Sequence, residues 1–321
     1  LILMGNGDRF KYQEYLLTIN DIWTNTTLKK EDFNANSLDT GYIGDDLYSL
    51  PFQNSLYYMY WNKTLFEQAG LDPEKPPTSF EEWTAMAEKI TNPDANVYGS
   101  GLFMSYGTHQ MCLMQLLGGW VVDQQSDGKF KVSIAGNEGI KKYLEWEKDL
   151  FDRGINPLEI EIDSMFKANQ IGIMVNGPWL APGADQSGVN FGMKKIFGKE
   201  PVGDVAGFFI TSSATEEEKL ACERFMQWWY TGSKGTKVED TAVSQWSIKN
   251  GFPTTYLPTA ECEAYISNER LKALNLDDNS KESIWIGTTP EFKGWSDVLA
   301  TIGSMSEAVI YGTPIEEAMQ T

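Results

Sequence analysis

Histidine is almost absent from this chain: of its 321 residues, only His109 is a histidine. A nucleophilic site of the Ser-His-Asp or Cys-His kind would have to use this one side chain. Cys112 follows it at the spacing H-x-x-C, but a zinc site needs further ligands and no second pair accompanies it. The hydrolase pattern G-x-S-x-G is also missing. We therefore expect no catalytic residue, no bound metal and no cofactor.

Cysteine and basic residues are scarce as well. The three cysteines, Cys112, Cys222 and Cys262, show no C-x-x-C spacing, and their number leaves disulfide formation open. Against 45 Asp and Glu residues there are 26 Lys and Arg residues, which gives a net charge of -19. Nucleic acid and anionic membrane surfaces repel such a chain, so we expect neither as a partner. No run reaches the roughly 20 apolar residues of a membrane helix.

Aromatic residues, in contrast, are plentiful, with 11 Trp and 14 Tyr. Their rings offer large apolar faces, and Trp and Tyr add a polar group to each face. Such a surplus often lines a site for a flat or ring-shaped ligand, although large cores use it too.

The order of sequence signals predicts an α/β fold. A length of 321 residues suits one large domain or two of medium size. Capping-box patterns start helices at Ser79 and Thr215, and another helix is enclosed between Gly139 and Gly154. Short β-rich runs alternate with these helices, at residues 55–61, 98–103, 171–175 and 205–210. This alternation favours a largely parallel sheet or sheets.

Both ends of the chain fall inside predicted elements. Residues 1–4 read as a strand, and residues 313–316 read as a capping box with proline at the first helical position. Only about two helical turns separate that box from Thr321. We therefore expect a piece of a longer protein, in which a strand–helix unit precedes Leu1.

The segment 171–179, with the sequence IGIMVNGPW, is the most informative in the chain. Its apolar residues predict a strand buried on both faces. Asn176, Gly177 and Pro178 then end the strand and leave Trp179 at its carboxyl end, where ligand crevices form in open α/β sheets. A flat apolar ring with one donor suits a sugar. The alternative is a tryptophan that caps the core.

Asp8 and Arg9 also follow a predicted strand. A carboxylate and a guanidinium there supply acceptors and a planar set of donors, which hydroxyl-rich ligands require. The alternative is a local ion pair on a loop. The preceding Gly5-Asn6-Gly7 does not complete a dinucleotide fingerprint, because Phe10 stands where the third glycine belongs.

Several segments together resemble a known family. They include PFQN at 51–54, LYYMYWNK at 56–63, LF at 65–66, AGL at 69–71 and PPTSFEEW at 76–83. Further agreement comes from residues 171–179, NGFP at 250–253 and GTPIEEAM at 312–319. In this order they resemble the extracellular solute-binding proteins of bacterial ABC sugar importers, the relatives of maltose-binding protein. The likeness spans nearly the whole chain.

The resemblance implies an α/β fold of the type II periplasmic-binding-protein kind, with two lobes joined by a hinge. Lobe one would comprise residues 1–54 and 207–285, without its N-terminal start, and lobe two residues 55–206 and 286–321. The chain would cross between the lobes near residues 54–55, 206–208 and 285–288.

The resemblance also implies where a sugar binds. Asp8, Arg9 and Phe10 match an Asp-Arg-Phe of the family whose acid and base hold sugar hydroxyls, and Trp179 matches a tryptophan that stacks on a sugar ring. The hinge and a loop at 107–109 add further contacts. The implied ligand-binding residues are Asn6, Asp8, Arg9, Gln53, Asn54, Ser55, Thr108, His109, Trp179, Asn250 and Trp295.

The expected function is that of a non-catalytic, monomeric substrate-binding subunit of an ABC importer. It would bind a carbohydrate between the lobes, an oligosaccharide in view of the aromatic surplus, and deliver it to membrane permease subunits. Kinship places it at the extracellular face of the cell membrane, anchored by lipid, or in the periplasm. The alternatives are a glycan-active enzyme, a hydrolase or lyase with an aromatic cleft, and a binding protein that serves a sensor.

Overall fold

A computed structural model describes residues 1–124, 130–158, 161–198, 203–274, 292 and 294–320. It separates into two compact units. The first consists of Leu1–Leu56 and Val202–Trp295, and the second of Tyr57–Pro201 and Ser296–Thr321. The crossing expected near residues 285–288 lies outside the described residues.

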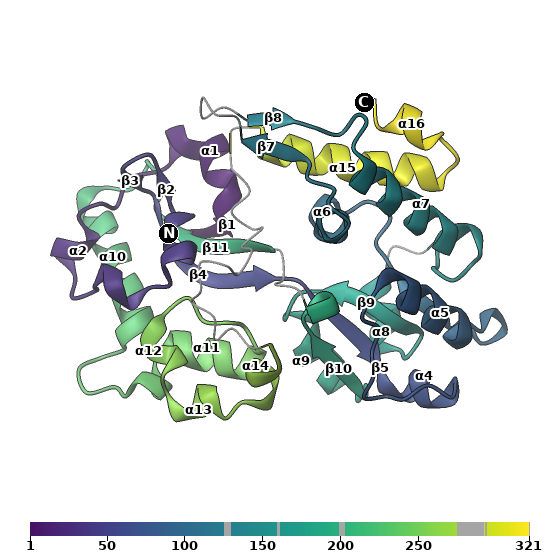
Figure 1. The fold of residues 1–321 in the computed structure, drawn as a ribbon. Coiled ribbons are helices and arrows are strands. Elements are labelled where there is room, and N and C mark those ends of the chain that lie inside the picture. The colour runs from purple at the N-terminus through teal and green to yellow at the C-terminus, as the bar shows by residue number, and fades with distance from the viewer. Residues whose placement is uncertain (125–129, 159–160, 199–202, 275–291, 293, 321) are drawn as a thin grey trace. The chain divides into compact units, whose positions relative to one another are not determined.

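The first unit is built on a three-stranded sheet in the order β1 (Ile2–Gly5), β11 (Gly203–Phe209), β4 (Ser49–Leu56). Both pairings are antiparallel, and the register of β11 against β4 shifts between Ala206 and Gly207. A small antiparallel pair, β2 (Tyr42–Ile43) and β3 (Asp46–Leu47), lies apart from this sheet. The helices of the unit are α1 (Arg9–Tyr12), α2 (Ile22–Asn25), α3 (Ala35–Asp39), α10 (Glu216–Thr231), α11 (Ala242–Asn250), α12 (Leu257–Ala260), α13 (Glu263–Ile266) and α14 (Glu269–Leu274) (Figure 1).

Aromatic rings form much of the core of the first unit. Phe52 on β4 lies 5.1 Å from Phe208 on β11, 5.0 Å from Trp229 on α10 and 5.2 Å from Trp246 on α11, measured between ring centroids. The helix α10 begins with the predicted capping box, in which Thr215 and Glu218 bond each other's backbone N–H. Part of the aromatic surplus is therefore core packing.

The second unit contains a four-stranded sheet in the order β10 (Phe191–Lys194), β5 (Tyr58–Asn62), β9 (Ile171–Asn176), β6 (Tyr98–Gly101). Every residue of β9 is buried, as its apolar sequence predicts. The helices α4 and α5 pack on this sheet, and β7 (Val122–Gln124) pairs with β8 (Phe130–Val132). The helices of the unit are α4 (Lys63–Gln68), α5 (Phe80–Ile90), α6 (Gly107–Leu116), α7 (Glu138–Asp152), α8 (Ile162–Lys167), α9 (Leu180–Gln186), α15 (Trp295–Ile310) and α16 (Ile315–Ala318).

The prediction of largely parallel sheets is wrong. Of the pairs between the described strands of the two sheets, only β6 with β9 is parallel. A strand that is buried on both faces reads as an apolar run whatever the direction of its neighbours, so the pattern carries no direction. The single β-rich run at 55–61 is also two strands, because β4 ends at Leu56 and β5 begins at Tyr58.

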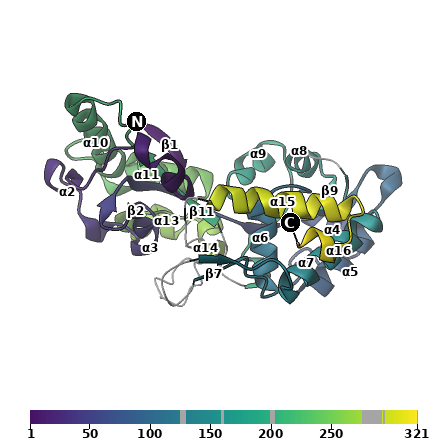
Figure 2. The ribbon, with the colours of Figure 1, turned by 90° about the horizontal axis from the view of Figure 1, so that it is seen from above.

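The last helices differ from the sequence prediction in one detail. The long α15 is followed by the short α16, drawn in yellow in Figure 2. Pro314 is the N-cap of α16 and no side chain caps this helix, so the capping box predicted at Thr313 does not form. Instead the backbone N–H of Thr313 bonds the carbonyl of Ala308 and ends α15.

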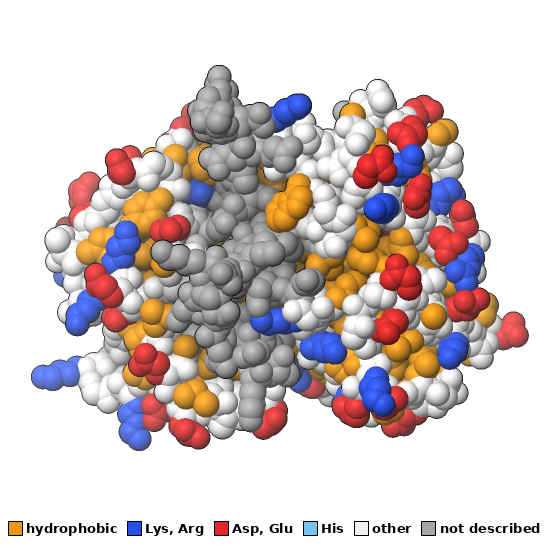
Figure 3. All heavy atoms as spheres, viewed as in Figure 1, with side chains coloured by type: hydrophobic (Ala, Val, Ile, Leu, Met, Phe, Trp, Pro, Cys, Tyr) orange, Lys and Arg blue, Asp and Glu red, His pale blue; other side chains and the backbone are white. Residues whose placement is uncertain are grey.

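The visible face of the molecule carries charged side chains of both signs. Acidic and basic side chains are interspersed on the face shown in Figure 3, as expected for a solvated surface. Within the described part of the chain, no helix combines the length and the apolar character needed to cross a membrane.

A buried carboxyl group joins three helices of the second unit. Glu147 on α7 is completely buried, and it accepts a hydrogen bond from the Tyr143 hydroxyl at 2.8 Å and another from Ser306 on α15. The side chain of Gln110 on α6 also favours the ionised form of this carboxyl group. Burial raises the pKa of Glu147 to about 7, although these hydrogen bonds act in the opposite direction.

This raised pKa predicts a pH-dependent stability. Since the pKa in the folded state exceeds the ordinary 4.5, the contribution of Glu147 is complete below about pH 4.5 and is lost as the pH rises through about 7. The loss from this group amounts to at most about 3 kcal/mol. Urea unfolding of the Glu147→Gln variant between about pH 5 and pH 8 should lack this component. The exposed Glu316→Gln variant should keep it, and an equal decline in Glu147→Gln would contradict the assignment.

A second prediction concerns Asn156, which is buried and ties two loops of the second unit together. Its side chain accepts a hydrogen bond from the backbone N–H of Leu102 at 2.7 Å and donates to the carbonyl of the same residue at 3.1 Å. Asn156→Ala leaves both buried groups without this partner, so we expect a loss of about 2–4 kcal/mol in the free energy of unfolding. The exposed Asn190→Ala variant serves as control and should change it by less than about 0.5 kcal/mol.

Candidate functional site

Trp179 follows the end of β9 and is partly exposed, at 38%. Its ring folds back over Gly177, where a Cβ atom would lie only 2.0 Å from the indole. Glycine at 177 is therefore required for this position of the ring. The predicted strand, its stop and the tryptophan at its carboxyl end are all present, and the indole is a partly exposed ring and not a buried plug.

Two tyrosines extend this aromatic surface. Tyr57 is buried and meets Trp179 edge-on, with 5.5 Å between ring centroids and an interplanar angle of 87°. Its hydroxyl donates to the hydroxyl of Tyr106 at 2.7 Å. The Tyr106 ring is 43% exposed. Trp179 and Tyr106 are thus two exposed rings of the second unit that one buried tyrosine holds, and we call these three residues the aromatic shelf.

His109 lies beneath the shelf, on the first turn of α6. It is completely buried, its Nε2 lies 2.7 Å from the carbonyl oxygen of Val175, and its ring is nearly parallel to that of Tyr106. Burial lowers the pKa of His109 to about 4. The imidazole is therefore neutral near pH 7 and donates from Nε2 to Val175. This histidine supports the shelf, while its neighbour Thr108 is partly exposed.

In the first unit, Asn6 and Arg9 fix the turn after β1. The buried Asn6 amide donates to Thr40 at 2.6 Å and accepts from Ser49 at 3.0 Å. Arg9 is also buried, and its guanidinium donates to the carbonyls of Asn6 at 2.7 Å and Tyr42 at 2.9 Å. Asp8, in the same turn, is partly exposed.

The predicted hinge residues point to opposite faces of β4, as alternating strand residues do. Gln53 and Ser55 are partly exposed and bonded to each other at 3.1 Å. Gln53 also accepts a hydrogen bond from the Trp246 indole at 3.0 Å. Asn54 is buried, and its amide bonds Ser37 at 2.9 Å and the carbonyl of Thr254 at 3.3 Å.

Of the two remaining predicted residues, Asn250 lies in the first unit and Trp295 lies at the point in the chain where the first unit ends and the second resumes. Asn250 ends α11, is partly exposed and donates to the carbonyl of Trp246 at 2.9 Å. Trp295 starts α15 and is buried, with its ring edge toward Phe292. The structure thus brings Asn6 together with Arg9, and Gln53 together with Ser55.

Sequence reasoning missed Tyr57, Tyr106 and Trp246, which contact the predicted residues. Tyr106 directly precedes Gly107 in the loop already singled out, so that loop was the available signal. Tyr57 lies in a run read as one continuous strand, and nothing local marks its contact with Trp179.

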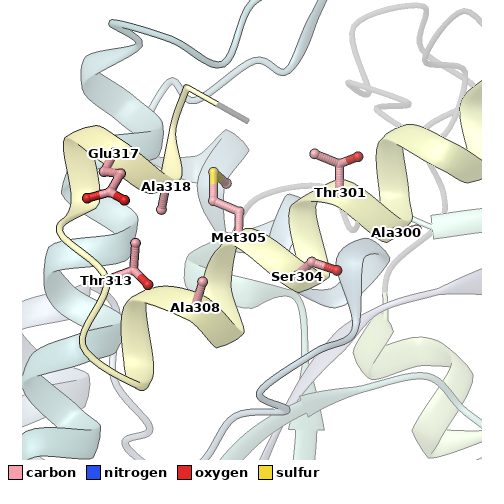
Figure 4. Close-up of a pocket in the computed structure, with 8 residues that line it drawn as sticks. All are labelled: Ala300, Thr301, Ser304, Met305, Ala308, Thr313, Glu317 and Ala318. Carbon is pink, nitrogen blue, oxygen red and sulfur yellow. The ribbon is translucent and has the colours of Figure 1, made fainter.

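A separate pocket of about 540 Å³ lies in the second unit. Its lining comes from α15, α16 and the turn between them (Figure 4). None of the predicted site residues lines it. No cluster of three or more His, Cys, Asp or Glu side chains that could hold a metal occurs among the described residues.

Comparison with known proteins agrees with the fold. The sequence pattern of the family described as "Bacterial extracellular solute-binding protein" matches residues 5–242. The galactooligosaccharide-binding protein of Bacillus subtilis is 23% identical over 299 residues, which is 89% of this chain and 63% of that protein. The maltotriose-binding protein of Pyrococcus abyssi is 26% identical over 206 residues, which is 59% of this chain and 41% of that protein. The chain thus spans less than two thirds of the length of these curated relatives.

Solved structures show the same architecture. The GacH receptor of Streptomyces glaucescens, solved without ligand and with acarbose, superposes with a TM-score of 0.79 at 17% identity, covering 99% of this chain and 80% of that one. CpMnBP1 with mannobiose bound superposes with a TM-score of 0.77 at 18% identity, and the match covers 99% of this chain and 81% of that one. The fold is therefore the α/β type II periplasmic-binding-protein fold. With a family match over most of its length, the chain belongs to the bacterial extracellular solute-binding proteins.

Proposed function

We propose that this chain is the substrate-binding subunit of an ABC importer and that it binds a carbohydrate, an oligosaccharide. The observation that supports this most directly is the aromatic shelf, in which Trp179 and Tyr106 expose 38% and 43% of their surface. Exposed rings can stack on the C–H faces of successive sugar units, and a site with two rings suits more than one unit.

The polar contacts are proposed to come from the residues expected at the outset. Asp8, Gln53 and Ser55 are partly exposed, so their oxygens and amide are accessible to hydroxyl groups. Arg9, Asn54 and His109 are buried and already bonded to the protein, so their proposed role is to hold their neighbours in place. Asn6 and Trp295 are also buried and would support the site in the same way, and the partly exposed Thr108 and Asn250 complete the proposed set.

The same proposal covers how the lobes bind the ligand, where the protein is located and which partners it has. The ligand would lie between lobe one, residues 1–54 and 207–285, and lobe two, residues 55–206 and 286–321, which close around it. The protein would act as a monomer beside permease subunits, either anchored by lipid at the extracellular face of the membrane or in the periplasm. The support is the family, which is described as bacterial extracellular solute-binding proteins.

The relatives suggest which sugars to test first. Maltotriose, galactooligosaccharides and mannobiose appear in the names of similar proteins. A ligand that binds only the folded state raises the melting temperature, and at a hundred times its Kd it adds about 2.7 kcal/mol to stability. We expect one of these oligosaccharides to do so in a concentration-dependent manner. Mass spectrometry of the recovered sugar should show it unchanged, and turnover would favour the enzyme alternative.

The shelf predicts the effect of removing its tryptophan. Trp179→Ala should weaken binding of that oligosaccharide by about 2 kcal/mol, or about thirtyfold in Kd, because a central stacking ring is lost. Trp228 is a matched control, since it is another exposed tryptophan, at 46%, and lies on α10, which carries none of the proposed contact residues. Trp228→Ala should leave the Kd unchanged in isothermal titration calorimetry. An unchanged Kd in Trp179→Ala would refute the stacking role.

The hydrogen bond between the hydroxyls of Tyr57 and Tyr106 predicts a smaller effect on the Kd. Tyr57→Phe keeps the ring that meets Trp179 but removes the donor to Tyr106, so the Tyr106 ring loses one of its restraints. We expect Kd to rise by about three- to tenfold, equivalent to one hydrogen bond. Tyr15→Phe, which removes the hydroxyl of an exposed tyrosine outside the proposed set of contacts, should have no effect on the same titration.

A further inference from the structure

The side-chain amide of Gln53, on β4 of the first unit, is held in a single orientation. Trp246 on α11 directs its indole N–H to this amide, with 3.0 Å between Nε1 and Oε1. An indole N–H only donates hydrogen bonds, so it must meet the oxygen of the amide and not the nitrogen. The Nε2 group of Gln53 then points the other way and donates to the Ser55 hydroxyl at 3.1 Å.

The indole that sets this orientation is itself held by aromatic packing in the first unit. Its ring centroid lies 5.2 Å from that of Phe52 and 5.8 Å from that of Phe252, and the planes of Trp246 and Phe252 differ by only 20°. Both phenylalanines are buried. Trp229 on α10 lies 6.4 Å away. Closely packed rings keep one rotamer, so the indole N–H stays directed at β4.

Ser55 is the last member of this chain of hydrogen bonds and is partly exposed. Its hydroxyl has one hydrogen and two lone pairs, and the bond from Gln53 occupies a lone pair. Within the part of the chain that the structure describes, the hydrogen is donated to no other group. Asn54, on the opposite face of β4, differs, because both ends of its amide bond the protein, at Ser37 and Thr254.

The reverse orientation of the amide would change what Ser55 offers to a ligand. If Oε1 of Gln53 faced Ser55, it would accept the hydroxyl hydrogen, and only lone pairs would remain on the accessible side. Trp246 opposes this reversal, since its N–H would then face the N–H groups of the amide and both donors would lose their acceptors. The indole therefore keeps the hydrogen of Ser55 available.

We propose that Trp246 is a positioning residue for the ligand site, which acts through Gln53 to make Ser55 a hydrogen-bond donor to a hydroxyl oxygen of the carbohydrate. The inference rests on the proposed function in one respect, namely that Ser55 contacts the sugar. The sugar hydroxyl at this point accepts a hydrogen bond and directs its own hydrogen elsewhere. We call the three residues Trp246, Gln53 and Ser55 the relay.

Nuclear magnetic resonance tests the first bond of the relay without any ligand. The Trp246 indole N–H is identified as the resonance that disappears in Trp246→Phe. Its exchange with solvent should be roughly fivefold faster in Gln53→Leu, because one hydrogen bond is lost. Gln245→Leu removes another amide of α11, which donates to the carbonyl of Glu239, and should leave the rate unchanged. An unchanged rate in Gln53→Leu would overturn the proposal.

The same method tests the second bond, between Gln53 and Ser55. The side-chain amide protons of Gln53 are identified by their loss in Gln53→Leu. In Ser55→Ala the proton that faces Ser55 should exchange roughly fivefold faster, while the exchange rate of the Trp246 indole stays constant. Amide protons that exchange alike in Ser55→Ala and wild type would contradict this bond and with it the proposal.

Gln53→Glu reverses the second bond of the relay with almost no change in shape. A carboxylate accepts both from the Trp246 indole and from the Ser55 hydroxyl, so the hydrogen of Ser55 turns away from the ligand. The probe is whichever of maltotriose, mannobiose or a galactooligosaccharide gives the largest thermal shift, together with its monodeoxy and monofluoro analogues. The hydroxyl that Ser55 contacts is the one whose deoxy analogue binds equally well to wild type and Ser55→Ala.

Calorimetry with the two analogues at that position reports the direction of the hydrogen bond. Fluorine accepts a hydrogen bond weakly and cannot donate one. Wild type should therefore bind the fluoro analogue roughly three- to fivefold more tightly than the deoxy analogue, and Gln53→Glu should lose or reverse this preference. The same preference in both proteins would overturn the proposal. So would a set of deoxy analogues that all remain sensitive to Ser55→Ala.

A double-variant cycle separates positioning by Trp246 from packing. Trp246→Phe keeps an aromatic ring in the core but removes the N–H. It should raise the Kd of the parent sugar roughly three- to fivefold in the wild-type background and less than about twofold in Gln53→Leu. An equal loss in both backgrounds would contradict the positioning role. If none of the three sugars binds, the proposed function fails, and the two exchange experiments decide the inference on their own.

Discussion

The way in which β9 ends is the constraint on which the second unit's candidate site depends. The Asn176 side chain donates to Asp163 at 2.6 Å and accepts from the N–H of Gly177 at 2.8 Å, while the Gly177 carbonyl accepts from Tyr60 at 2.7 Å. One residue earlier, the carbonyl of Val175 bonds His109. The strand is fully buried, so these polar groups need partners inside the protein, and satisfying them sets the direction in which the chain leaves the sheet. The position of Trp179 follows from that direction.

The shelf is therefore assembled before any ligand arrives. Tyr57 is buried between its two partners, and His109 and Gln110 hold the start of α6 from below. Side chains that are already ordered lose little conformational entropy on binding, which favours affinity. In the first unit the same is true of Gln53, whose amide is held by Ser55 and Trp246. The two units thus offer different chemistry, aromatic rings in the second and polar groups in the first, but both in fixed geometry.

Most features set by neighbouring residues could be predicted from the sequence, the capping box at Thr313 being an exception, and features set by distant contacts could not. The burial of β9, its stop at Gly177 and the capping box at Thr215 are local, and the structure has them. Strand direction is a property of the pairing, so an apolar run such as 171–175 cannot report it. The burial of His109 and the contact between Tyr57 and Trp179 arise from packing between segments far apart in the chain. The position of a strand or helix in the chain was therefore easier to predict than the exposure of the side chains on it.

The exposure of Trp228 and Trp120 has a consequence for spectroscopy. Both are at least as exposed as Trp179, at 46% and 38%, and the chain holds 11 tryptophans in all. Its intrinsic emission is therefore a sum to which several exposed rings contribute. A change at the single indole of the shelf would alter only a small part of that signal. A fluorescent signal specific to Trp179 would thus first require Trp228 and Trp120 to be replaced by phenylalanine.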